Sequence, residues 1–435
     1  MDKTNLSKAL FKRACNVFPG GISHNIRFFQ PYPFFVERAQ GKNVYDVDGN
    51  TFVDFWMGHW ALILGHSPPA VVQPLVNELG QGTLFGTVNH ASVLLGEVIQ
   101  EVVPAADLMR FCSTGSEATM YATRIARAFT GKKIVAKVTG AWHGFNSDLM
   151  HSVNYPFETN EGLGLTGSEG DFVESLPFND LPGSIAILDT VREDLACIML
   201  EPLLGGAGGV VGEKDYLIGL REYADKNNVL LILDEIVTGF RLTFGTLSAL
   251  YGLEPDLLTL GKIVGGGFPI GVVCGKKEIM KITDPAGKEK QDRCYVGGGT
   301  FSSNPISMKA GLLTMNYLQT NKESIYTKIN QLGDQSRLKL KQTFGDCGID
   351  VEVTGLGSLI HMHFLKENLM HIKDATDAAA TDQEKLLKYH LCLLSDYGIF
   401  FLPKKMGAIS FAHDNKDLAS LLSATQDIIN RGILS

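Results

Sequence analysis

Three short segments of the sequence combine residue types that could do chemistry on a small molecule. They are STGSEATM at 113–120, LLILDEIVTGFR at 230–241 and LTLGKIVGGGFPIG at 258–271. In the first, a Gly-Ser pair opens an expected helix, where free backbone N–H groups and the positive end of the helix dipole can bind phosphate. The same pair is as typical of an ordinary helix cap, so the motif alone decides nothing.

An acidic and a basic residue each follow a strongly apolar run. Asp234 comes directly after Val229–Leu233, and Lys262 follows Leu257–Leu260 with one glycine between them. A carboxylate at the end of a buried strand needs a cation or a donor, and a protonated ring nitrogen would serve. A buried amine must pair or lose its proton, and the neutral amine is a nucleophile toward aldehydes. Alone, Lys262 could equally be a lysine on a surface loop. The prediction of a reactive amine therefore depends on the three segments occurring together.

Alternating strand-like and helix-like runs must position these residues. Val229–Leu233 is apolar throughout, as expected for a strand covered on both faces by helices. Apolar residues recur at helical spacing from 118 to 129, and Ile134–Val138 is a predicted strand. The order strand, helix, strand implies right-handed crossovers and a largely parallel sheet, with ligands beyond the carboxyl ends of its strands. Asp234 and Lys262 both lie at such ends.

The composition narrows the function classes. Of 435 residues, 45% are hydrophobic and 20% charged, and the formal net charge is -8. The sequence has no excess of basic residues of the kind that binds nucleic acid or an anionic membrane. No apolar run approaches the roughly 20 residues of a membrane span. The opening run MDKTNLSKALFKRA predicts an amphipathic helix rather than a secretion signal. Seven cysteines without a Cys-x-x-Cys pair fit a reducing compartment, so we expect a soluble, cytoplasmic protein.

Together these segments resemble the class III, fold-type I pyridoxal-phosphate aminotransferases, and within them the glutamate-1-semialdehyde 2,1-aminomutase branch. The resemblance extends nearly end to end. Its further motifs are PGGISHNIRFF, DVDG before FVDF, GH at 65–66, RIARAFTGK, AWHG at 141–144, LEP at 200–202 and GTFSSNP at 299–305.

The resemblance implies the roles of the cofactor contacts. Lys262 would hold pyridoxal phosphate as a Schiff base and later move protons, while Asp234 would keep the ring nitrogen protonated, which makes the ring an electron sink. The remaining implied contacts are Gly115 and Ser116 to the phosphate, Trp142 stacked on the ring, His143 beside it, and Thr300 to the phosphate of the neighbouring subunit.

The resemblance also implies a substrate pocket and a partner. Arg27 matches the arginine that binds the substrate carboxylate through two parallel hydrogen bonds. His59 and Lys405 are candidate substrate contacts, at positions where relatives carry a tryptophan and, nearby, a glutamate. The family forms at least homodimers, whose active sites are shared between subunits.

In fold, the resemblance implies an α/β protein: a large domain around a mostly parallel central sheet, and a smaller α+β domain formed by the N- and C-terminal parts. After about Gly311 the pattern changes to longer polar helices around the predicted strand Ser358–Phe364. We therefore predict an N-terminal segment at 1–65 that packs with the small domain, a large cofactor-binding domain at 66–311, and the small domain at 312–435.

Mutase and transaminase chemistry both remain open. In the mutase, the cofactor in its pyridoxamine form would give nitrogen to glutamate 1-semialdehyde and take the other nitrogen back, which yields 5-aminolevulinate, a tetrapyrrole precursor. The segment Tyr155–Gly167 matches the mobile lid of mutases, or is simply a long surface loop. Gly206 stands where an asparagine is expected, and EPLLGGAGG at 201–209 is similar to relatives that transaminate β-amino acids or other amines.

Other interpretations have less support. A nicotinamide-dependent dehydrogenase should show Gly-x-Gly-x-x-Gly after an early strand, and none is found. A non-catalytic protein on this fold would be expected to lack Lys262 or Asp234. His361 and His363 share one face of a predicted strand, but two ligands do not make a metal site, so we predict none. Arg241 is expected to be a structural anchor rather than a catalytic group.

Overall fold

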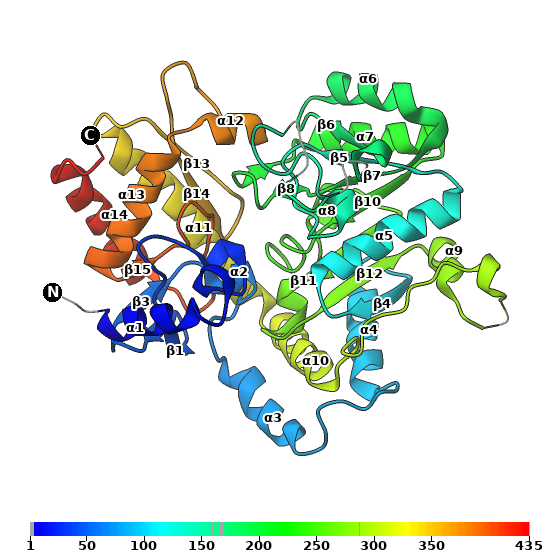
Figure 1. The fold of residues 1–435 in the computed structure, drawn as a ribbon, viewed down its shortest axis with the longest axis horizontal. Coiled ribbons are helices and arrows are strands. Elements are labelled where there is room, and N and C mark those ends of the chain that lie inside the picture. Colours follow the sequence, from blue (N-terminus) through cyan, green and yellow to red (C-terminus); the bar gives the residue numbers. More distant parts are fainter. Residues whose placement is uncertain (1–3, 158–160, 166–168, 287, 435) are drawn as a thin grey trace.

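A seven-stranded sheet forms the centre of one half of the molecule (Figure 1). The computed structural model describes residues 4–157, 161–165, 169–286 and 288–434. In spatial order the strands are β4 (Leu108–Cys112), β12 (Gly271–Gly275), β11 (Leu257–Gly261), β10 (Leu230–Asp234), β7 (Leu195–Leu200), β5 (Ile134–Val138) and β6 (Val173–Leu176). All neighbours from β11 to β6 are parallel, and β12 is antiparallel to both of its neighbours. The predicted mostly parallel sheet is confirmed.

Helices cover both faces of this sheet. Successive side chains of a strand point to opposite faces, so Ile232 packs in the cluster that contains α5 (Gly115–Thr130). Leu231 and Leu233 pack instead with the apolar face of α7 (Lys214–Asn227). The continuous apolar run of β10 is therefore explained by burial on both sides, as the sequence predicted.

The N- and C-terminal parts of the chain combine in the other half of the molecule, where the blue and red ends of Figure 1 meet. One sheet has the order β1 (Val36–Gln40), β2 (Asn43–Asp46), β3 (Thr51–Asp54), β15 (Ile399–Phe400), and β15 is parallel to β3. A second has the order β13 (Val351–Thr354), β14 (Leu359–Phe364), β16 (Gly407–Ala408). This agrees with the expected α/β fold with a smaller α+β part, while the boundaries at 65 and 311 stay a prediction.

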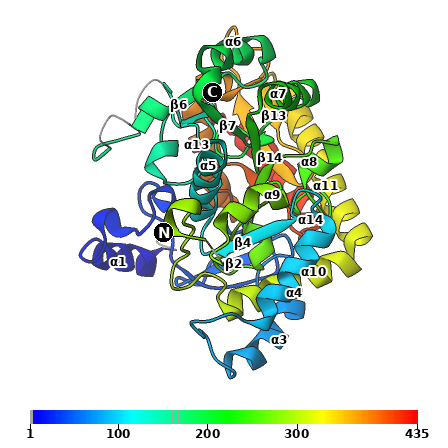
Figure 2. The ribbon, with the colours of Figure 1, turned by 90° about the vertical axis from the view of Figure 1, so that its right-hand side faces the viewer.

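Helices complete both halves. The C-terminal ones are α11 (Lys322–Gly345), α12 (Ala375–Ala380), α13 (Gln383–Tyr397) and α14 (Asn415–Asn430). Figure 2 shows α3 (Pro69–Leu79), α4 (His90–Val102) and α10 (Pro305–Thr320) grouped at one end of the molecule. The remaining elements are α1 (Asn5–Ala14), which confirms the predicted N-terminal helix, α2 (Met57–Trp60), α6 (Leu181–Val191), α8 (Leu247–Tyr251), α9 (Lys277–Met280), β8 (Leu203–Leu204) and β9 (Val210–Val211).

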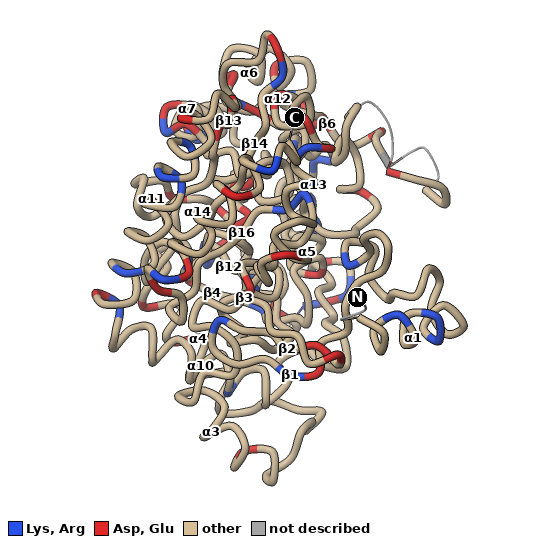
Figure 3. The backbone as a smooth tube through the Cα atoms, turned by 90° about the vertical axis from the view of Figure 1, so that its left-hand side faces the viewer, with Lys and Arg blue, Asp and Glu red and all other residues tan. Residues whose placement is uncertain are grey.

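Charge is distributed rather than concentrated. Figure 3 shows basic and acidic residues interspersed along the chain, in line with the small net charge of -8. Within the residues that the structure describes, no helix has the length and apolar character that crossing a membrane requires.

Candidate active site

Three neighbouring parallel strands end at the same edge of the central sheet, and each is followed by a charged side chain or carries one at its end. They are Glu201 after β7, Asp234 at the end of β10 and Lys262 after β11. Leu200 lies opposite Leu233, and Asp234 lies opposite Thr259, so the three ends are in register. The carboxyl edge of the sheet therefore brings together the two residues that the sequence singled out and one that it did not.

The carboxylate of Asp234 is buried and held by three donors. Its Oδ1 accepts hydrogen bonds from Thr259 Oγ1 at 2.9 Å and from the backbone N–H of Ile236 at 3.1 Å. Its Oδ2 lies 2.8 Å from His143 Nδ1. Three donors offset the cost of removing this charge from water and hold the carboxylate in one orientation.

One ring nitrogen of His143 has a hydrogen-bond partner, and the other has none among the described residues. Because a carboxylate can only accept, Nδ1 carries the proton in the contact with Asp234. Burial, the largest cause, lowers the pKa of His143 and keeps the ring neutral near pH 7. Its Nε2 is then a buried acceptor without a partner among the described residues. A buried polar atom left open in this way is expected where a bound group completes the site.

Lys262 begins the short helix η6 (Lys262–Gly265) with a positive φ of 46°, which is unusual for a side chain of this size. Burial lowers the pKa of Lys262 to about 8, while the charges of Asp234 and Glu201 oppose that decrease. Its Nζ lies 5.4 Å from the ring centroid of Trp60. An amine with this pKa can both hold and release a proton near neutral pH.

Glu201 is one of two residues near the site that sequence reasoning missed. Its Oε1 accepts from the backbone N–H of Trp142 at 2.9 Å, and its Oε2 accepts from that of Gly205 at 3.0 Å. Burial and then the charge of Asp234 raise the pKa of Glu201 to about 8. The available signal was its position directly after a buried strand, which is the same rule that identified Asp234.

The start of α5 forms a cradle next to this edge. Thr114 caps the helix by accepting from the backbone N–H of Glu117 at 3.2 Å, and the N–H groups of Gly115 and Ser116 have no acceptor within the helix. A Cβ on Gly115 would lie 2.7 Å from Cδ1 of Ile236, so a larger residue there requires the end of the Ile236 side chain to shift. The positive helix end and the free N–H groups suit an anion such as phosphate.

The segment 141–144 lies against this cradle. Thr119 Oγ1 donates to the carbonyl of His143 at 2.6 Å, and the backbone N–H of Phe145 donates to Ser116 Oγ at 3.2 Å. Trp142 is 43% exposed beside the buried His143. The structure thus brings Gly115, Ser116 and the 142–143 pair together with Asp234, although their roles as cofactor contacts stay predictions.

On the substrate side, two histidines lie beside Lys262. Arg27 is exposed in the short helix η2 (Asn25–Arg27), and His24 immediately precedes that helix. The ring centroids of His24 and His59 are 5.4 Å apart. Lys262 acts electrostatically on both imidazoles, which places the three residues around one space. His24 was not singled out from the sequence, because a lone histidine in an irregular segment carries no distinctive signal.

Trp60 connects this space to the small domain. Its indole Nε1 donates to the carbonyl of Met406 at 2.7 Å, and its own carbonyl accepts from Arg241 Nη2. Arg241 therefore anchors the chain at Trp60, as the sequence suggested. Lys405, next to Met406, is partly buried, and burial lowers its pKa. Its charge acts on the buried His361, and its role in binding substrate stays a prediction.

Several other residues singled out in the sequence have plainer surroundings. Thr300 is exposed, and Gly299 before it lies close to Glu117 at the start of α5. Gly206 is exposed beside Trp142. The expected lid at 155–167 includes residues 158–160 and 166–167, which lie outside the described residues.

The paired histidines of β14 have a structural partner. Their ring centroids are 4.5 Å apart, and His363 Nε2 lies 2.9 Å from the carbonyl of Gly208. Within the described ranges, no group of three or more His, Cys, Asp or Glu side chains is arranged to hold a metal ion.

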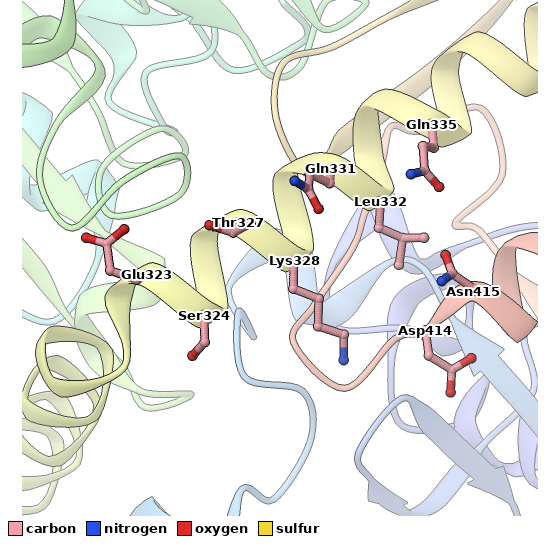
Figure 4. Close-up of a pocket in the computed structure, with 9 residues that line it drawn as sticks. All are labelled: Glu323, Ser324, Thr327, Lys328, Gln331, Leu332, Gln335, Asp414 and Asn415. Carbon is pink, nitrogen blue, oxygen red and sulfur yellow. The ribbon is translucent and has the colours of Figure 1, made fainter.

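A hollow of about 600 Å³ lies away from the site, along α11 and the start of α14 (Figure 4). Two of its charged residues already have partners, since Lys328 Nζ donates to the carbonyl of Phe411 at 2.8 Å and Asp414 pairs with Lys42 at 3.3 Å. The chemistry-bearing residues are therefore at the sheet edge and not in this hollow.

Comparison with known proteins agrees with this geometry. The family model of aminotransferase class-III matches residues 27–385. The glutamate-1-semialdehyde 2,1-aminomutase of Methanobrevibacter smithii is 36% identical over 426 residues, which cover 97% of each chain. An ω-transaminase from Sphaerobacter thermophilus superposes with a TM-score of 0.91 at 30% identity, covering 98% of this chain and 97% of that one. A transaminase with pyridoxal phosphate bound has a TM-score of 0.90 at 30% identity, covering 99% and 98%.

Proposed function

This chain belongs to the class-III aminotransferase family, and we propose that it is a glutamate-1-semialdehyde 2,1-aminomutase that forms 5-aminolevulinate. It is a pyridoxal-phosphate enzyme, as class-III aminotransferases are. The observation that carries the proposal is the similarity to aminomutases over 97% of the chain. Family membership also sets aside a nicotinamide-dependent dehydrogenase.

The residues at the sheet edge fit pyridoxal phosphate. The cradle at Gly115 and Ser116 suits its phosphate, the orphaned Nε2 of buried His143 is free to accept a hydrogen bond, and the amine of Lys262 suits its aldehyde. When bound, the cofactor supplies an aldehyde that takes up amino groups and a ring that withdraws electrons. Asp234, held by Thr259, would balance a protonated ring nitrogen.

Lys262 is the proposed acid and base of the reaction. When it is not bonded to the cofactor, its Nζ would be free to take a proton from one carbon and return it to another. A pKa of about 8 leaves roughly a tenth of the amine neutral at pH 7, and that fraction is the base.

We propose that Arg27 binds the substrate carboxylate, with His59 and Lys405 on the same side of the pocket. Arg27 is exposed and has no ion pair among the described residues, so its guanidinium is free for a bidentate contact. This arrangement leaves the amino end of a short substrate directed toward Lys262.

A homodimer with shared active sites is also proposed. Large apolar side chains are exposed on α3, on the segment before α4 and on the segment before α10, including Val76, Val88, Tyr295 and Phe301, and Val88 is 90% exposed. Exposed apolar side chains of this size are typical of an interface, and exposed Thr300 directly precedes Phe301. The seven free cysteines fit a reducing cytoplasm.

A transaminase of β- or ω-amino substrates is the second candidate. Gly206 is exposed and stands where an asparagine was expected, so the side chain expected beside Trp142 is missing from this chain. Transaminases at 30% identity share the fold with TM-scores of 0.90 and 0.91.

One assay separates the two candidates. Holoenzyme is mixed with glutamate 1-semialdehyde alone, and 5-aminolevulinate is quantified by chromatography, with Lys262→Ala as the inactive control. Product formed without any amine donor or keto acid supports the aminomutase. Turnover that requires an added donor and acceptor would replace it with the transaminase.

A further inference from the structure

Three basic residues lie on one side of Lys262 without an acidic partner. Arg27 and His24 come from one short segment, and His59 comes from α2. Within the described part of the chain, the charged groups that act on the two imidazoles are Arg27 and Lys262, and no carboxylate is among them. The fold therefore gathers positive charge and hydrogen-bond donors that no side chain neutralises.

The ring of His24 is oriented to donate outward. Its Nδ1 accepts from the backbone N–H of Ile26 at 3.4 Å, which places the proton of the neutral ring on Nε2. No described residue accepts from that Nε2. His24 is exposed, so a ligand in the pocket can reach it.

His59 is held in position by an unfavourable backbone conformation. Its φ is 60°, and Met57, Gly58 and Trp60 on either side also have positive φ values. Its ring lies between Trp56, at a centroid distance of 4.6 Å, and His24. Backbone strain of this kind persists where the surrounding structure enforces it, and it marks side chains whose placement matters.

We propose that His24 and His59 join Arg27 in a receptor for one anionic group of the substrate, a carboxylate or an oxyanion of similar size, and that the imidazole of His24 takes up a proton when that group binds. The proposal rests on the amino-transfer function, because it concerns the substrate pocket of the same site. It adds two residues and a proton to the single arginine expected from the sequence.

The direction of the proton movement follows from the charges. Burial and then the neighbouring cations lower the pKa of His24, and the same causes lower that of His59 to about 3, so both shifts favour the neutral ring as long as no anion is bound. A bound anion opposes these cations and raises both pKa values. The pKa of His59 would have to rise from about 3 to about 7 for that ring to protonate at pH 7, so the exposed His24 is the ring expected to take up the proton on binding. Affinity then falls as pH rises, by at most about tenfold per pH unit for one proton.

The test uses propane-1-sulfonate, whose charge does not change between pH 6 and pH 8. Its binding to the holoenzyme is measured by titration calorimetry in buffers of different ionisation enthalpy, which reports the number of protons taken up. We expect net uptake and an affinity several-fold higher at pH 6 than at pH 8. The double variant His24→Asn, His59→Asn keeps hydrogen-bonding groups that do not titrate, and it should lose both the uptake and the pH dependence.

Two controls sharpen the outcome. His371→Asn removes a histidine whose side chain is 67% exposed outside the site, and it should behave as wild type. His24→Gln alone tests an exposed position if the double variant is unstable. Proton uptake that persists unchanged in both site variants, or binding of uncharged butanamide as tight as that of the sulfonate, would overturn the proposal. The sulfonate carries no amine, so failure of aminomutase turnover would leave this result intact.

Discussion

Glu201 should make the protein less stable as pH rises, and Glu201→Gln should remove that effect. Burial and the neighbouring charge of Asp234 raise the pKa of Glu201 from 4.5 to about 8 in the folded apoprotein. The folded state therefore keeps a proton that the unfolded chain gives up between these two values. Stability from this group is complete below the unfolded pKa and is lost as pH rises through the folded pKa.

The magnitude follows from the width of that window. Each pH unit inside it costs about 1.4 kcal/mol, so this carboxyl alone lowers the free energy of unfolding by roughly 4 kcal/mol between pH 5 and pH 8. A glutamine cannot titrate, and its NH₂ group must face one of the two N–H donors, of Trp142 or Gly205, that Glu201 now satisfies. That mismatch costs about 1–3 kcal/mol at every pH. The variant is therefore offset from wild type, and the two stability curves differ in slope.

Urea unfolding of both apoproteins at pH 5.5, 6.5 and 7.5 measures the slopes. Glu97→Gln is the matched control, because it makes the same change on the exposed surface of α4. Relative to wild type, the free energy of unfolding of Glu201→Gln should rise by about 1.4 kcal/mol per pH unit. That of the Glu97→Gln control should change with pH in parallel with wild type. Parallel curves for all three proteins would refute a raised pKa at Glu201.

Three further predictions address the site. Asp234→Asn should reduce kcat/KM in the semialdehyde assay by about 100-fold or more, since breaking a buried charged contact costs about 3–5 kcal/mol; a loss below tenfold would contradict its role. Gly115→Ala should destabilise the protein by no more than about 1 kcal/mol in urea unfolding, because the atom nearest its Cβ, at 2.7 Å, is the flexible end Cδ1 of Ile236, which can shift; a larger loss that is restored by adding Ile236→Val, which deletes that methyl group, would show that Ile236 cannot give way. Trp60→Phe should leave the Met406 carbonyl without its 2.7 Å donor and cost about 1–3 kcal/mol of unfolding free energy, whereas an unchanged midpoint would show that this hydrogen bond is not needed.

Local patterns predicted the elements that carry the cofactor side of the site. The strand at Ile134–Val138 has the bounds expected for it, and α5 begins at Gly115 as predicted. These predictions succeeded because periodicity and glycine punctuation are local signals that the two-sided sheet preserves. The placement of Asp234 and Lys262 at neighbouring strand ends followed from the rule for parallel sheets.

Pairings between distant segments could not be predicted in this way. The parallel contact between β3 and β15 joins residues that are almost 350 positions apart, and neither two-residue β15 nor its partner has a distinctive pattern. The meeting of His24 with His59 depends on that same packing of the N-terminal segment. Glu201 is different, because its position after an apolar run was visible in the sequence and the rule was simply not applied to it.

The fully buried guanidinium of Arg241 stabilises the left-handed turn at Met57–Trp60. Each non-glycine residue in this conformation costs about 1–2 kcal/mol, so the turn must be held from outside. Arg241 holds it through the carbonyl of Trp60, although its Nε and Nη1 find no partner among the described residues and burial lowers its pKa to about 10. This decrease in the pKa of Arg241 means that burial destabilises the charged guanidinium by about 3 kcal/mol. One hydrogen bond from a charged group stabilises by a similar amount.

Arg241→Met should therefore change the free energy of unfolding by less than about 2 kcal/mol, because the lost hydrogen bond and the relieved desolvation nearly cancel. Turnover should fall much more, since His59 and Trp60 would leave their positions beside Lys262. Urea unfolding and kcat/KM measured on the same preparation separate the two effects. A variant that lost stability and activity in proportion would show instead that Arg241 only supports the fold.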